Sequence, residues 1–260
     1  SLKSKEVKMS KTNNKKAVNI FDGATSGGGL EEVTSEDIQI PFLRVLQALS
    51  PQIKKSDPAY IKGAEQGGIF NTVTKKFWSG DDGVLVIPVH FQKKLLEFVP
   101  RSEGGGFVGE LDPKNLPKVV KEDNGMEMLE NGNELVRTAQ HYVKIVHDDG
   151  NLENAIVDMK KTQLKKSREW VSIMGMFKYP KEAGPKLVGT TMDSWYNIYR
   201  LTTVEESNDK GSWYTWKIVQ EKQVDTTQCI NESKSLHLSL LKGDVKALPP
   251  TDANKDEVPF

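Results

Sequence analysis

The chain has 260 residues, of which 28% are charged and 37% are hydrophobic, with a mean hydropathy of -0.52. No run of about 18 apolar residues is present, so we expect neither a membrane span nor a membrane partner. Lys and Arg together number 36, as do Asp and Glu. Because these charges balance, net charge favours neither an anionic nor a cationic partner, and the distribution of charge along the chain has to decide.

The histidine and cysteine content argues against a structural metal or a disulfide. Cys229 is the single cysteine and has no partner within the chain, and no secretory pattern opens the sequence, so we expect a reducing, cytoplasmic setting. The four histidines show no zinc-ligand spacing. We therefore expect no metal and no cofactor. The histidines are His90, His141, His147 and His237.

The N-terminal part of the chain predicts an arm followed by the start of order. Residues 1–36 are rich in Lys, Asn, Ser and Gly and lack hydrophobic periodicity, which is typical of a flexible arm. In the stretch 35–51, Pro41 can open a helix and three leucines follow at helical spacing. This stretch predicts either a short docked helix or an irregular buried segment.

The middle of the chain has the pattern of β-structure. Two apolar runs, 84–91 and 94–101, predict strands, and Pro88 places the first near a sheet edge or a bulge. The stretch 103–135 contains several turn formers and predicts a long surface loop.

A hairpin and a helix follow. The runs 141–146 and 153–159 flank an Asp-Gly turn that permits positive φ, so they predict a β-hairpin. The stretch 160–177 lacks proline and has a period near 3.6, which predicts a helix.

The C-terminal third predicts two more strands and a second helical segment. The strands are expected at 195–204 and 212–222, and the helix at 232–242. Five to seven strands with an inserted helix favour a mainly β fold with inserted helices: an OB-like antiparallel barrel with long loops and disordered termini. The expected division is a flexible arm at 1–36, the barrel at 37–243, and an acidic tail at 244–260.

The predicted helix carries a cationic stripe. Lys161, Lys165 and Arg168 fall at i, i+4 and i+7, so they share one face, while apolar residues line another that can pack on a sheet. The stripe is equally compatible with a solvated helix face and with a track for phosphates.

Aromatic residues in the last two predicted strands favour the nucleic-acid interpretation. Proteins that bind single strands combine cationic grooves with aromatic faces on which bases stack, each stack being worth about 1 to 3 kcal/mol. Alternation places Trp213 with Lys217, and Tyr196 with Arg200, on shared faces. We take these two pairs as candidate DNA contacts, although the pattern does not fix which face is exposed.

The last five residues, "DEVPF" (256–260), combine acidic side chains, a stiff proline and a terminal aromatic residue. This end resembles the acidic tip of bacterial single-stranded DNA-binding proteins, which ends in Ile-Pro-Phe. In that family the tip recruits replication and repair enzymes and competes with DNA for the binding groove. The resemblance implies the same partner-binding role here, with a valine in place of the isoleucine and with Lys255 interrupting the acidic run. The residues concerned are Asp256, Glu257, Val258, Pro259 and Phe260.

The body of the chain resembles a group of bacteriophage proteins assigned to single-stranded DNA binding. The resemblance rests on the stretches "IPFLRVLQALSP" (40–51), "AEQGGIFNT" (64–72) and "GVLVIPVHF" (83–91). It implies a role in phage DNA replication, recombination or repair, in the cytoplasm of the infected bacterial host, with single-stranded DNA as the partner and no enzymatic activity. A homodimer is left open.

Two alternatives remain. Asp158-x-Lys160 is similar to the Asp/Glu-x-Lys step of restriction-like nucleases, in which the carboxylate binds a metal. The nearest acids in sequence, Asp148 and Asp149, sit at the predicted hairpin turn, over about 20 Å from Asp158 along the ladder, and cannot share a metal with it if the hairpin forms. Glu134 or Glu110 could take their place, although nothing in the sequence singles them out. The second alternative is an adaptor whose basic helix and acidic tail both contact proteins.

Overall fold

A computed structural model describes residues 28–32, 39–121, 125–209 and 211–245. The chain divides into two units, 1–34 and 35–260. In the first unit the described residues 28–32 form turns. The remaining description concerns the second unit. Most of the expected N-terminal arm and the terminal segment 246–260, which includes the "DEVPF" tip, lie outside the described residues.

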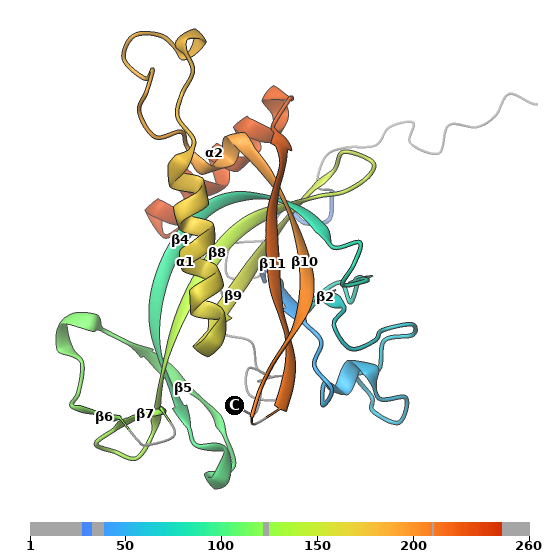
Figure 1. The fold of residues 1–260 in the computed structure, drawn as a ribbon, viewed down its shortest axis with the longest axis vertical. Helices are drawn as coiled ribbons and strands as arrows, with labels where there is room; N and C mark the ends of the chain where they lie inside the picture. Colours follow the sequence, from blue (N-terminus) through green and yellow to red (C-terminus); the bar gives the residue numbers. More distant parts are fainter. Residues whose placement is uncertain (1–27, 33–38, 122–124, 210, 246–260) are drawn as a thin grey trace, which may run out of the picture. The chain divides into compact units, whose positions relative to one another are not determined.

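The described residues confirm a mainly β fold, in which a strongly curled sheet forms a half-barrel accompanied by two helices (Figure 1). The strand order is β11-β10-β4-β8-β9-β1-β2-β3; β5 pairs with β4, and β7 pairs with both β6 and β8. The pairs are antiparallel except for β1 with β9, which is parallel. The strands are β1 (Phe42–Val45), β2 (Ile69–Asn71), β3 (Phe77–Trp78), β4 (Val84–Val99), β5 (Gly106–Leu111), β6 (Val119–Lys121), β7 (Glu127–Leu129), β8 (Glu134–Val146), β9 (Leu152–Lys160), β10 (Asn197–Asn208) and β11 (Gly211–Gln223), and the helices are α1 (Leu164–Met176) and α2 (Thr227–Lys242).

Several predicted elements are confirmed. The hairpin is β8–β9, the aromatic strand pair is β10–β11, and the two helices are α1 and α2. The ladder between β4 and β8 is irregular between Pro88 and His90, so Pro88 lies at a predicted bulge. The strand can continue through this proline because the bulge interrupts regular pairing there.

Other predictions of local structure are wrong. The stretch expected to be a docked helix or an irregular buried segment is not a helix. It contains strand β1, in which Phe42, Leu43 and Val45 are all buried. The irregular residues 46–50 follow, and Leu46, Gln47 and Ser50 among them are buried, so the second alternative holds in part. Because both faces of β1 are covered, its sequence shows no alternation. Leu43 in the strand and Leu46 and Leu49 after it fall at a spacing that imitates a helix. The two expected strands at 84–101 are one strand, β4, and the expected loop 103–135 contains β5, β6 and β7.

The inner face of the sheet packs on α1. Trp170 of α1 is fully buried, stacks on His141 of β8 at 4.5 Å between ring centroids, and meets Tyr199 of β10 edge-on at 5.7 Å. His141 Nε2 also lies 2.8 Å from Ser167 Oγ. These contacts fix α1 across the curled sheet.

The outer face packs on α2. Alternation along the strands sends Tyr142 and Ile156 to the side opposite the α1 core, where they cluster with Phe42. Leu240 of α2 packs against this cluster, and Lys144 Nζ lies 3.7 Å from Glu232. Neither described helix is long and apolar enough to cross a membrane.

Side chains complete the half-barrel between β1 and β11. The Gln47 amide donates to the Tyr214 carbonyl at 2.8 Å and accepts from the Tyr214 N–H at 2.9 Å, as a paired strand would. A backbone hydrogen bond of 3.0 Å from the Thr203 N–H to the Gly80 carbonyl ties β10 to the segment between β3 and β4. Gly67 has a φ of +82° and lies so close to Tyr214 that a Cβ would sit 2.5 Å from its ring.

Replacing Gln47 by Ala removes this bridge and leaves the N–H and carbonyl of Tyr214 without those partners. We expect the free energy of unfolding to fall by about 1 to 3 kcal/mol, measured by urea denaturation. Gln66→Ala, which shortens an exposed glutamine in the nearby loop, is the matched control and should leave the stability within about 0.5 kcal/mol. Equal stability of the two variants would contradict the bridging role.

Burial gives His141 a defined effect on stability. It lowers the pKa of His141 to about 3, whereas an unfolded histidine has a pKa near about 6.5. Between these values the unfolded chain binds a proton that the folded chain does not. The free energy of unfolding therefore falls as pH falls through this window, by up to about 1.4 kcal/mol per pH unit.

His141→Gln should remove this contribution. The free energy of unfolding, measured by urea denaturation, should then fall less steeply between pH 6 and pH 4 than it does in the wild type. Ser167→Ala removes the same hydrogen bond but keeps the imidazole, so it should be less stable with a wild-type slope. A wild-type slope in His141→Gln would show that His141 does not stay neutral on folding.

Candidate nucleic-acid interface

The cationic stripe of α1 is partly as predicted. Lys165 and Arg168 are exposed and lie opposite the buried Trp170, because residues two and five positions away point to the other side of a helix. Lys161 is not on the helix: it belongs to a 3-10 turn, has a φ of +48°, and its Nζ lies 3.4 Å from Glu134. The predicted i, i+4, i+7 spacing is therefore wrong for Lys161, since α1 begins three residues later.

A groove of about 490 Å³ runs between α1 and the β4–β8 ladder. Its apolar lining includes Phe91, Leu95 and Val171, and its cationic lining includes Lys93 and Arg168. Apolar surface beside cations is the combination that unpaired bases and phosphates require.

The cations of this region differ in whether they are paired. Arg137 forms two hydrogen bonds with Glu127, and Lys94 Nζ lies 2.7 Å from Glu110. Within the part of the chain that the structure describes, Lys93, Lys165 and Arg168 form no ion pair. Their charges remain available to an anionic ligand.

The aromatic strand pair does not form the predicted stacking platform. Trp213 is only 7% exposed and Trp216 only 1%, so neither offers a free face to a base. Tyr196 lies in a 3-10 turn before β10 and packs edge-on against Tyr179 at 5.5 Å. Its predicted place on a strand face with Arg200 is therefore wrong.

The two cations assigned to this strand pair have different surroundings. Arg200 donates two hydrogen bonds of 3.0 Å to Glu221 and one to the Asp82 carbonyl, which commits its guanidinium to structure. Lys217 is exposed on β11. The residues from Asp256 to Phe260 lie outside the described residues.

The comparison with protein-family models decides the family: the Pam3 phage gp34-like protein model matches residues 10–246. The chain belongs to the Pam3 phage gp34-like family. No curated protein and no solved structure matches it.

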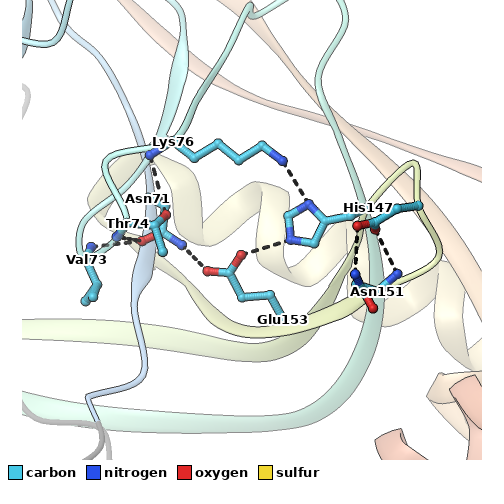
Figure 2. A network of polar contacts seen from close by, with 8 residues as sticks. Asn71, Val73, Thr74, Lys76, His147, Asn151 and Glu153 are labelled. Carbon is cyan, nitrogen blue, oxygen red and sulfur yellow. Dashed lines mark hydrogen bonds and ion pairs between the residues drawn. The ribbon is translucent and has the colours of Figure 1, made fainter. Parts of the chain in front are cut away.

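Sequence reasoning missed a second polar region of this Pam3 phage gp34-like protein. Figure 2 shows His147 between Lys76 and Glu153. The Nδ1 atom of His147 lies 2.9 Å from Lys76 Nζ, and its Nε2 atom lies 2.9 Å from Glu153 Oε2. Lysine only donates hydrogen bonds, so Nδ1 of His147 accepts and its ring proton is on Nε2, facing Glu153. Asn71 donates to Glu153 at 2.6 Å, and the network ties the β2–β3 turn to the β8–β9 turn.

This network borders a cleft of about 240 Å³ that is lined by Trp78, Lys76 and Arg200. Lys76 Nζ lies 5.2 Å from the centre of the Trp78 ring, a cation–π contact. The sequence signal was the "KKFW" stretch at 75–78, in which lysines directly precede aromatic residues. Half-buried Trp78 and Phe91 are better placed to meet a base than the aromatic residues predicted on β10 and β11.

The surroundings of Asp158 do not resemble a metal site. Thr138 donates a hydrogen bond to Asp158, and Lys160 Nζ lies 3.5 Å from its other oxygen. Asp158 pairs with Gln140 in the β8–β9 ladder, which leaves Asp148 and Asp149 at the far turn. No group of three or more His, Cys, Asp or Glu in the described ranges has the arrangement to hold a metal.

We expect a single-stranded oligonucleotide to remain full length after incubation with the protein and Mg²⁺, as judged on a denaturing gel. Asp158→Ala should instead lower the free energy of unfolding, because it removes the acceptor of the Thr138 hydroxyl and a partner of Lys160. Cleavage by the wild type that disappears in Asp158→Ala would restore the nuclease interpretation.

Proposed function

We propose that this Pam3 phage gp34-like protein binds single-stranded DNA without reading its sequence and is not an enzyme. The observation that carries the proposal is the groove between α1 and the β4–β8 ladder, where apolar Phe91 and Leu95 lie beside Lys93 and Arg168. Phosphates attract the cations, and unpaired bases cover the apolar surface.

The proposed binding is electrostatic and sequence-independent. A lysine or arginine that contacts a phosphate releases a condensed counterion, so affinity falls with salt, with a slope of about -0.7 per contact on a single strand. Lys165 extends the unpaired charge of Arg168 along the exposed side of α1. A single strand exposes the faces of its bases, whereas a duplex does not, so the apolar lining favours the single strand.

The biological setting is part of the same proposal. Membership of a phage family supports a role in phage DNA replication, recombination or repair in the cytoplasm of the infected host. The acidic Pro-Phe terminus recruits partner proteins of these processes and, when unoccupied, competes with DNA for cationic surface. A role in DNA metabolism accounts for a groove and an acidic tip in one chain.

Fluorescence anisotropy with a labelled single strand and its duplex, over a range of salt concentrations, tests the proposal. The wild type should prefer the single strand. Lys165→Ala combined with Arg168→Ala should weaken binding at least tenfold and flatten the salt slope by about 1.4, since two phosphate contacts are lost. A chain that ends at Pro250 should bind DNA more tightly if the tail competes.

Lys234→Ala combined with Lys242→Ala is the matched control, because it removes the same charge from exposed positions of α2. It should bind as the wild type does. Equal weakening in both double variants would reject the α1 surface as the binding site. If the wild type binds neither DNA form, the DNA role fails, and a protein adaptor becomes the better account.

A further inference from the structure

A small pocket opens where the parallel strands β1 and β9 separate. The two strands pair at Phe42 with Ile156 and at Leu43 with Val157, and no pair follows. The pocket has a volume of about 70 Å³ at this point. One water needs about 10 to 15 Å³ on this scale, so the pocket has room for a group of several heavy atoms.

The pocket is rich in cationic side chains. Arg44, Lys160 and Lys161 line it, together with the carboxylate of Asp158. Asp158 is engaged by Thr138 and Lys160, and Glu134, the partner of Lys161, lies beyond the lining residues. Counting Glu134, three positive charges stand against two negative ones around the pocket, and this excess favours an anion.

Arg44 is the residue that most requires a ligand. Its Nη2 is buried and makes no hydrogen bond, and among described residues no ion pair joins Arg44 to Asp158. The guanidinium carbon lies 5.6 Å from the centre of the Phe42 ring, which fixes the side chain from one side. A buried charged donor without a partner is costly, and such donors in native proteins generally have one.

The backbone at the rim of the pocket is strained. Lys161 has a φ of +48°, in the left-handed region that non-glycine residues rarely adopt. Strain of this kind is found preferentially at ligand sites, where the surrounding structure holds it in place. Here it turns the chain from β9 toward α1 and keeps Lys161 at the pocket.

The pocket adjoins the proposed DNA groove. Thr138 lines the groove and donates its hydroxyl hydrogen to Asp158, which lines the pocket. Leu164 lines the groove and follows Gln163, which lines the pocket. A strand lying in the groove therefore passes beside the pocket.

We propose that this pocket binds one phosphate of the DNA backbone through the guanidinium of Arg44, an inference that rests on the proposed DNA binding. The guanidinium fork matches the geometry of phosphate oxygens, and the unpaired Nη2 supplies one of the donors. Lys160 and Lys161 add charge around the same group.

The test compares wild type, Arg44→Gln and the control Lys62→Gln, which removes one charge from an exposed loop. In anisotropy titrations with oligo-dT, Arg44→Gln should bind about tenfold more weakly, and its salt slope should be less steep by about 0.7, the value for one phosphate contact. Lys62→Gln should match the wild type. If Arg44→Gln loses the same factor in affinity with and without a 5′-phosphate on the oligonucleotide, the phosphate bound in the pocket is an internal one.

A second measurement separates failure of this pocket from failure of the DNA proposal. Inorganic pyrophosphate, with ionic strength matched by NaCl, should raise the melting temperature of the wild type and of Lys62→Gln, but not of Arg44→Gln. Without ligand, Arg44→Gln should melt at or above the wild-type temperature, since it removes a buried, unsatisfied donor. This result also shows that the variant folds.

Each outcome has one meaning. If the wild type binds oligo-dT and Arg44→Gln has the same affinity and salt slope, the pocket assignment is overturned and the DNA proposal stands. If the wild type does not bind DNA but pyrophosphate stabilises it through Arg44, the DNA proposal fails and the pocket binds another phosphate. If pyrophosphate stabilises wild type and Arg44→Gln equally, Arg44 does not form the anion site.

Discussion

The packing of Trp170 against the inner face of the sheet is the constraint on which the candidate interface depends. Trp170 is fully buried between His141 and Tyr199, so the rotation of α1 about its own axis is fixed. Because Lys165 and Arg168 lie on the other side of the same helix, their exposure follows from the burial of the tryptophan. The groove exists because the anchored helix lies beside a ladder, β4–β8, that continues past it.

The balanced net charge of the chain conceals an unequal local distribution. Several described cations of the sheet are paired with acids, such as Arg200 with Glu221 and Arg137 with Glu127. Exposed pairs of this kind add little stability, with a median near about 0 to 1 kcal/mol, but they neutralise the surface around them. Among the described cations that form no ion pair, Lys93 of β4 and Lys165 and Arg168 of α1 lie at or beside the groove. A protein with no net charge can therefore present a local cationic surface. The dependence of its DNA affinity on salt then reflects the number of phosphates that this surface contacts rather than the net charge.

The sequence predicted element types better than it predicted faces. The hairpin β8–β9 and helix α1 were predictable because local patterns of turn chemistry and periodicity specify them. The burial of Trp213 was not predictable, because alternation assigns residues to faces but does not say when both faces are covered. Strand β1 was missed for the same reason, and with it the parallel pairing that places Arg44. Trp78 was not predicted as a candidate contact, because its cation–π contact with Lys76 depends on the turn that follows β2.

Closure of the half-barrel and the pocket at Arg44 have one structural origin. A continuous ladder between β1 and β11 would satisfy every backbone group there, but it would also fill the space between the strands. Gln47 instead pairs with Tyr214 through its side chain. The side-chain amide provides hydrogen-bond partners for the N–H and carbonyl of Tyr214 while keeping the two backbones further apart than paired strands would be. Gln47 and Trp216 thus line the pocket while holding the sheet together. The amide bridge secures the edge strand and leaves an opening beside β9, and the charged residues of the chain that line this opening are three cations and one carboxylate.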